Sequence, residues 1–178
     1  MTENTKKKFG LLPGSISGLL TTGLLLSAGW IFYSRRYIDH NAKVKGVLEA
    51  EQGTFDAPTA GKLRFYADTR GSGRPLLILH GIHAAAGVHD IAPIFNAFKS
   101  QRPVYALDLP GFGASERSDR PYRPSMYQAA VLEFIRGQIG APADVAALGL
   151  SAEFAALAAQ ADPEWVRSLI MICPAGFE

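Results

Sequence analysis

Cysteine is almost absent from this chain of 178 residues, which contains only Cys173. A single cysteine excludes a disulfide within the chain and offers no metal-ligand spacing. We therefore expect neither a metal site nor a cofactor. Cys173 closes the apolar run 169–173, a position that favours a buried structural thiol over a reactive one.

An excess of charge of one sign is also lacking. The formal net charge is only +2, which gives no strong signal for binding a polyanion, and we expect no nucleic-acid partner. Internal repeats and low-complexity tracts are absent as well. What the chain does have is 48% hydrophobic residues and enough length for one domain with a real core. Its oligomeric state is left open.

Charged residues are missing altogether from residues 9–33. About 20 apolar residues cross the hydrocarbon core of a bilayer, so this stretch predicts a single transmembrane anchor behind a basic tail, residues 1–8. Aromatic side chains, which prefer the membrane interface, gather at its C-terminal end. They are Trp30, Phe32, Tyr33 and Tyr37.

Two alternatives to the anchor are a cleavable signal peptide and a buried helix of a soluble protein. Ser27 and Gly29 are small enough for a cleavage site, but the apolar run continues beyond them to Tyr33, which favours an uncleaved anchor. No polar face interrupts the run, which weighs against a soluble helix. Basic residues flank the span on both sides in nearly equal number, so the side of the membrane that holds the rest of the chain is not predicted.

A polar linker, residues 34–52, leads to a predicted soluble domain, residues 53–178. Residues 62–67 alternate as in a half-exposed strand, which we expect to pair antiparallel with 53–55. Four continuous apolar runs follow, as is typical of strands covered on both faces of a parallel sheet. They are 76–79, 104–107, 145–148 and 169–173.

Helical patterns lie between these runs. One apolar stripe spans 91–98, with Asp90 as the expected N-cap. Another spans 127–135, with Ser125 and Gln128 at the spacing of a capping box. The alternation of strands and helices predicts an α/β fold with a mostly parallel, doubly wound sheet.

Three loops follow strands at their carboxyl ends, where a parallel α/β sheet places its chemistry. The first is His80-Gly81-Ile82-His83 and the second runs from Asp108 to Ser115. The third is the bend at Gly149-Leu150-Ser151-Ala152, which lies between a strand and a helical stripe. A strand, Gly-x-Ser-x and a helix are the context of a serine nucleophile elbow, although the usually small fifth position is Glu153.

In this order the three motifs resemble the N-terminal half of the α/β-hydrolase family, over about residues 53–178. The resemblance implies that Ser151 is the nucleophile and that the backbone N–H groups of Ile82 and Ala152 form the oxyanion hole. It implies an ester or a related acyl compound as substrate. It also implies that His80 is architectural.

The remaining motif residues are expected to shape the loops rather than to react. They are Gly81, Asp108, Gly111, Gly113 and Gly149. A carboxylate such as that of Asp108 can accept hydrogen bonds from neighbouring N–H groups, and glycine permits the positive φ of tight turns. For His83 and His89, near the expected pocket mouth, ordinary loop histidines are the favoured interpretation.

No histidine follows Ser151, whereas the triad of this family runs in the order Ser, Asp or Glu, His. We expect the chain to be a fragment that lacks the triad acid and histidine and leaves the strand at 169–173 as an unpaired edge. Two hypotheses stay open. One is a membrane-anchored serine hydrolase, incomplete in this chain. The other is a non-catalytic, membrane-tethered binding module.

Overall fold

The computed structural model describes residues 14–38 and 48–175. The chain divides into two compact units, Met1–Val44 and Lys45–Glu178. Each unit is therefore described by itself.

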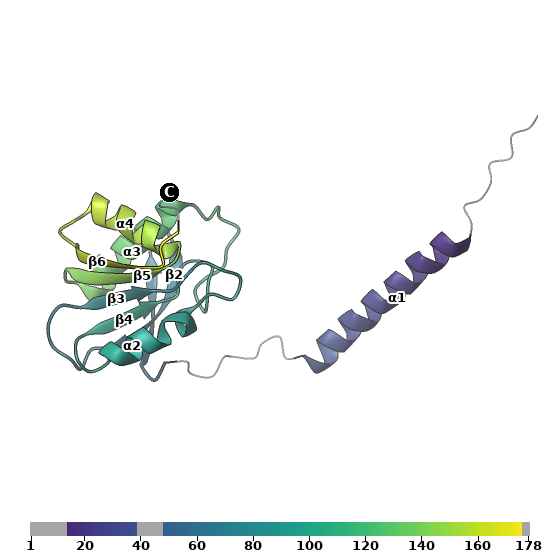
Figure 1. The fold of residues 1–178 in the computed structure, drawn as a ribbon, viewed down its shortest axis with the longest axis horizontal. Coiled ribbons are helices and arrows are strands. Elements are labelled where there is room, and N and C mark those ends of the chain that lie inside the picture. Colours follow the sequence, from purple (N-terminus) through teal and green to yellow (C-terminus); the bar gives the residue numbers. More distant parts are fainter. Residues whose placement is uncertain (1–13, 39–47, 176–178) are drawn as a thin grey trace, which may run out of the picture. The chain divides into compact units, whose positions relative to one another are not determined.

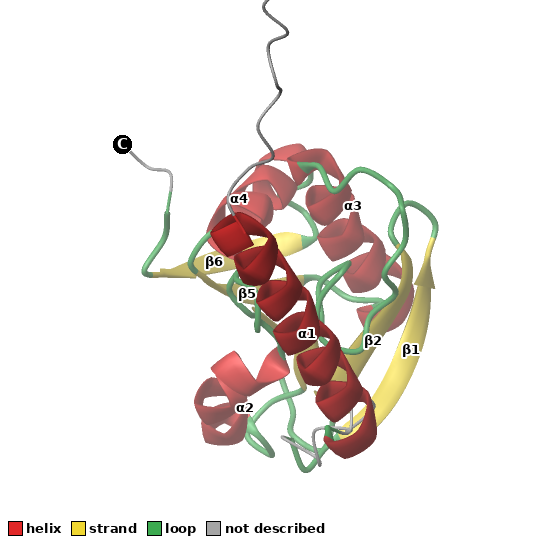
Figure 2. Cartoon of the chain, turned by 90° about the vertical axis from the view of Figure 1, so that its right-hand side faces the viewer, coloured by secondary structure: helices red, strands yellow, loops and turns green. Residues whose placement is uncertain are grey.

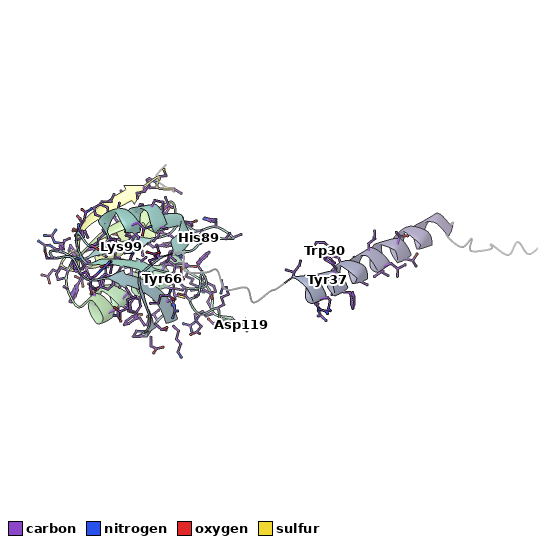
Figure 3. All side chains as sticks on the ribbon, turned by 90° about the horizontal axis from the view of Figure 1, so that it is seen from below. Trp30, Tyr37, Tyr66, His89, Lys99 and Asp119 are labelled. Carbon is purple, nitrogen blue, oxygen red and sulfur yellow. The ribbon has the colours of Figure 1, made fainter. Side chains whose placement is uncertain are left out.

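The described part of the first unit, residues 14–38, forms the helix α1 (Gly14–Tyr37). The hydroxyls of Thr22 and Ser27 donate to carbonyls one turn earlier, so the helix itself satisfies these polar groups. The side chains of Trp30 and Tyr37 stand away from the helix and are exposed (Figure 3).

The transmembrane prediction for residues 9–33 is not decided by this helix. Within residues 14–38 and 48–175, no helix combines the length and the apolar character needed to cross a membrane. Residues 9–13 of the predicted anchor, and residues 39–47 of the predicted linker, lie outside the described part of the chain. The anchor stays a prediction.

The second unit is built on a six-stranded sheet with the strand order β1-β2-β4-β3-β5-β6. The first two strands pair antiparallel, as predicted, and β2 also pairs antiparallel with β4. The other neighbours pair parallel. The strands are β1 (Glu51–Ala57), β2 (Gly61–Asp68), β3 (Leu76–Leu79), β4 (Val104–Leu107), β5 (Ala143–Leu148) and β6 (Val166–Ile172).

Helices cover both faces of the sheet, with α3 (Pro124–Phe134) and α4 (Ser151–Ala161) on one side and α2 (Ala92–Phe98) on the other (Figure 1). Side chains of a strand point alternately to the two faces. Leu77 and Leu79 therefore join the core under α3 and α4, while Leu76 and Ile78 join the core that α2 covers. The predicted α/β class and mostly parallel sheet are confirmed.

Both helix starts differ from the sequence prediction. A short 3₁₀ turn, η1 (Val88–Ile91), contains Asp90, and α2 begins after Ile91 without a side-chain cap. The helix α3 begins at Pro124. The residue before it, Arg123, holds the N-cap position but makes no capping hydrogen bond with its side chain. Proline suits the first helical position and holds the residue before it extended, so the helix starts before Ser125 can act as a cap. A π-helical turn, η2 (Ile135–Ile139), extends α3 to Gly140.

The predicted edge position of the last apolar run is confirmed, but two other predictions about this run are wrong. The strand β6 is not covered on both faces, because it lies at the edge of the sheet and most of its side chains are at least partly exposed. Cys173 is exposed rather than buried. It follows the end of β6 with φ +46°, so it leaves the strand before it can pack into the core.

Candidate functional site

The carboxyl ends of β4, β3 and β5 lie side by side at one edge of the sheet. Leu79, the last residue of β3, pairs with Leu107 of β4 and with Ala147 of β5. The three loops singled out in the sequence therefore start next to one another, as predicted. Hydrogen bonds between buried polar groups join them.

The loop after β4 is folded around Asp108, which is almost fully buried. Its carboxylate accepts hydrogen bonds from the N–H groups of Val88 (3.1 Å) and Ala114 (2.9 Å). Gly113 has φ +51°, and a Cβ atom there would lie 2.2 Å from the Asp108 carboxyl carbon. The Asp108 carboxylate serves as acceptor for these backbone N–H groups in place of carbonyl oxygens. These hydrogen bonds fit a structural role for Asp108.

Ser115 is a member of this loop that the sequence prediction left without a role. Its hydroxyl donates to the Asp108 carbonyl (2.5 Å) and accepts from the Arg64 N–H on β2 (2.8 Å). Its place as the final serine of the Asp-x-Pro-Gly-x-Gly-x-Ser motif was the signal that could have identified it. The serine ties the loop to the neighbouring strand.

His80 is fully buried and uses both ring nitrogens. The Leu109 N–H donates to Nε2 (3.0 Å), so the ring proton is on Nδ1, which lies 2.6 Å from the Gly81 carbonyl oxygen and donates to it. Burial lowers the pKa of His80, because the charged ring would lose its hydration. A neutral ring with both nitrogens engaged has no free lone pair for a proton from a substrate.

Ser151 begins α4 and has no exposed surface. Its hydroxyl donates to the carbonyl oxygen of His80, at an Oγ–O distance of 2.5 Å. The hydroxyl therefore joins the loop after β3 to the helix after β5. In this geometry it does not face a space that a substrate can enter.

The two residues predicted to supply the oxyanion donors, Ile82 and Ala152, have different surroundings. Ile82 is half-buried in the loop after β3 and packs against the core. The N–H of Ala152 donates a hydrogen bond to the Gly149 carbonyl (3.1 Å), as part of the tight turn that leads into α4. This N–H is therefore not available to a substrate oxygen. Gly81 shows no tight contact that would require glycine.

His83 and His89 lie on the outer side of the loops and share one carboxylate. Nε2 of His83 lies 2.9 Å from the Asp90 carboxylate, and Nε2 of His89 lies 3.3 Å from it. Among the residues that the structure describes, no group of three histidine, cysteine or acidic side chains could hold a metal ion.

A charged hollow lies at the opposite edge of the sheet, near the end of β2. Its lining includes Glu49, Asp68, Arg70 and Lys99. Asp68 pairs in register with Val104, the first residue of β4, whereas the candidate site lies beyond the last residue of that strand. The hollow and the three loops are therefore separate.

A parallel-stranded core with these three interlocked loops defines an α/β-hydrolase-type protein. The profile of the alpha/beta hydrolase family matches residues 76–178, and the chain belongs to that family. No curated protein matches it in sequence.

Several solved structures have a fold similar to that of this chain. A membrane phospholipase A described as a bacterial virulence factor shares 23% identity (TM-score 0.67), with 92% of this chain and 52% of that chain covered. A serine hydrolase of carbazole degradation shares 20% (TM-score 0.62; 72% and 49% covered). A probable hydrolytic enzyme from Pseudomonas aeruginosa PAO1 shares 19% (TM-score 0.65; 73% and 43% covered). The chain thus spans about half the length of these proteins.

Proposed function

We propose that this chain is a membrane-tethered α/β-hydrolase module that binds an ester-like small molecule at the three-loop edge without hydrolysing it. The observation that carries the proposal is the state of Ser151, whose hydroxyl is fully buried and donates to the His80 carbonyl. A serine nucleophile must be exposed at the top of the sheet and hydrogen-bonded to a base. His80, the histidine buried beneath these loops, has both ring nitrogens engaged in hydrogen bonds and is neutral.

The second candidate is a membrane-anchored serine hydrolase in which Ser151 attacks an ester carbonyl. It is favoured by the strand, turn and helix around Ser151 and by the solved hydrolases that share the fold. For this function the hydroxyl must leave His80 and turn outward. A histidine would also have to come from residues other than those that follow Ser151, and the acids Asp162 and Glu164 lie in the connection between α4 and β6.

One experiment tests whether Ser151 reacts as a nucleophile in this chain. The full chain and its Ser151→Ala variant are compared for hydrolysis of 4-nitrophenyl butyrate and for labelling by a fluorophosphonate probe. We expect neither turnover nor labelling to differ between them. Strong labelling that Ser151→Ala abolishes would instead establish the serine hydrolase.

Binding is measured separately, as a shift of the melting temperature with phenyl butyrate. A ligand that binds the folded state stabilises it in proportion to RT ln(1 + [L]/Kd). A saturable rise in Tm is the expected result. No rise at millimolar ester would rule out the binding module.

The proposal includes an anchor formed by residues 9–33. Its support is the absence of charge in this span, together with the exposed Trp30 and Tyr33 near the C-terminal end of α1. The expressed full chain should stay in the membrane pellet on extraction with alkaline carbonate. Leu25→Arg places a charge in the middle of the span, at a cost of about 2.5–3.5 kcal/mol for a membrane-inserted helix, and should release the protein. Release of the unaltered chain would contradict the anchor.

A further inference from the structure

The turn between β5 and α4 has its sharpest residue at Gly149 rather than at Ser151. The strand ends at Leu148 and the helix begins at Ser151. Between them Gly149 has φ +60°, in the left-handed region, while Leu150 is already in the right-handed helical region. Ser151 does not have a positive φ. The chain therefore changes direction two residues before the serine.

A nucleophile elbow places its reactive residue on this strained strand-to-helix turn, with small residues two positions before and after it. Around Gly149 those positions hold Ala147 and Ser151, both of which are fully buried. In this register the small fifth position is Ser151. Glu153 and Phe154 then fall inside the helix, and the departure noted in the sequence disappears.

The space around Gly149 and Ser151 also favours Gly149 as the nucleophile position. A Cβ atom built on Gly149 would meet no atom within 4 Å, so a side chain there would project into open space. The side chain of Ser151 is enclosed and its hydroxyl is held by His80. Of these two positions, only Gly149 has room for a side chain that meets a substrate.

We propose that Gly149 occupies the nucleophile position of the elbow and that Ser151 is a positioning residue that fixes α4 to the loop after β3. The oxyanion donor that follows the nucleophile is then the N–H of Leu150, not that of Ala152. This inference rests on the proposed function and deepens it. An elbow without a side chain leaves room for an acyl group beside its N–H groups and has no atom with which to attack it.

The test measures which position is open in the folded protein. The exposed Cys173 is first replaced by Ser in the full chain, so that no native thiol remains. Gly149→Cys and Ser151→Cys are then made separately in that background, and their rates of alkylation by iodoacetamide are measured under native conditions. We expect Gly149→Cys to react at least tenfold faster. Equal rates, or a faster reaction of Ser151→Cys, would overturn the assignment.

A side chain at φ +60° is strained, so Gly149→Cys can fail to fold. In that event Ser151→Cys alone decides, with circular dichroism as the check on its fold. It should be protected in buffer and react only in urea. Rapid alkylation of the folded variant would overturn the inference.

This outcome is independent of the ester experiments. Protection of Ser151→Cys supports the assignment even if no ester binds, and ester binding does not rescue the assignment if Ser151→Cys is reactive.

Discussion

At the residue scale, buried polar side chains hold the candidate site together. His80, Asp108 and Ser151 are all nearly or fully buried, and each makes a hydrogen bond to a backbone group of another loop. Buried polar groups are costly unless they are paired, and these pairs link segments that are far apart in the sequence. The polar residues at this edge therefore act first as supports for the loops.

Ser151→Ala should lower the free energy of unfolding by about 1–3 kcal/mol. The substitution removes a buried hydrogen bond and leaves the His80 carbonyl without that donor. Urea denaturation of the full chain in detergent gives the measurement. Ser72→Ala, in an exposed loop, is the matched control and should change the value by no more than about 0.5 kcal/mol. Equal effects of the two substitutions would mean that the Ser151 hydroxyl carries no such bond.

At the element scale, strands and their order along the chain were predictable, and their ends were less so. The runs 76–79 and 104–107 form strands with the predicted bounds because these residues are apolar or aromatic and all but the half-buried Tyr105 are buried. The starts of helices and of β6 depend on neighbours that a local pattern does not contain. This is why the starts of β6, α2 and α3 differ from expectation, whereas the edge position of β6 was predicted.

The meeting of three loops at the candidate site was predictable from the sequence. Which residue occupies the nucleophile position of the elbow was not. Parallel strands bring their carboxyl ends to one edge, so the sequence order of the motifs was sufficient for that step. The reactive position depends on which residue has a positive φ, and Gly149 and Ser151 are only two residues apart. The one sequence signal for the alternative register was Glu153, where a small residue was expected.

A second prediction at the scale of elements concerns Asp144. This residue links β5 to neighbouring segments at the end of the sheet opposite the candidate site. Its carboxylate accepts from Arg102 (2.5 Å), Arg74 (3.1 Å) and the Ser168 hydroxyl on β6 (2.8 Å). Burial on its own would raise the pKa of Asp144, but these three hydrogen bonds outweigh it and leave the pKa below its ordinary value.

A carboxyl group whose pKa is lower in the folded state stabilises the fold above its unfolded pKa of about 3.9. That contribution is lost as the pH falls through the folded pKa. Asp144→Asn should therefore cost about 2 kcal/mol at pH 7, and the cost should shrink as the pH falls below about 3.9 towards the folded pKa. Urea midpoints measured between pH 7 and 2.5 test this. Asp119→Asn, at an exposed loop position (Figure 3), is the control. A cost that does not change with pH would contradict the role assigned to the carboxylate.

At the scale of the whole molecule, the sheet of the second unit has two outer strands, β1 and β6 (Figure 2). The two edges differ in character. Exposed positions of β1 carry polar side chains such as Glu51 and Thr54, whereas β6 exposes polar side chains near its start and apolar ones further along. Ile170 is 51% exposed and Met171 is 44% exposed. A long apolar edge strand is a template for pairing with another chain.

We expect the second unit, expressed as residues 45–178, to self-associate through β6. Ile170→Lys places a charge on the exposed face of this strand, which disfavours edge pairing, and should shift the protein toward monomer. Thr69→Lys adds the same charge at an exposed loop position next to β2 and should leave association unchanged. Sedimentation velocity between 5 and 100 µM, about the range in which exposed edges aggregate, gives the measurement. A unit that remains monomeric throughout this range, or an Ile170→Lys variant that associates as strongly as Thr69→Lys, would show that β6 is not the associating edge.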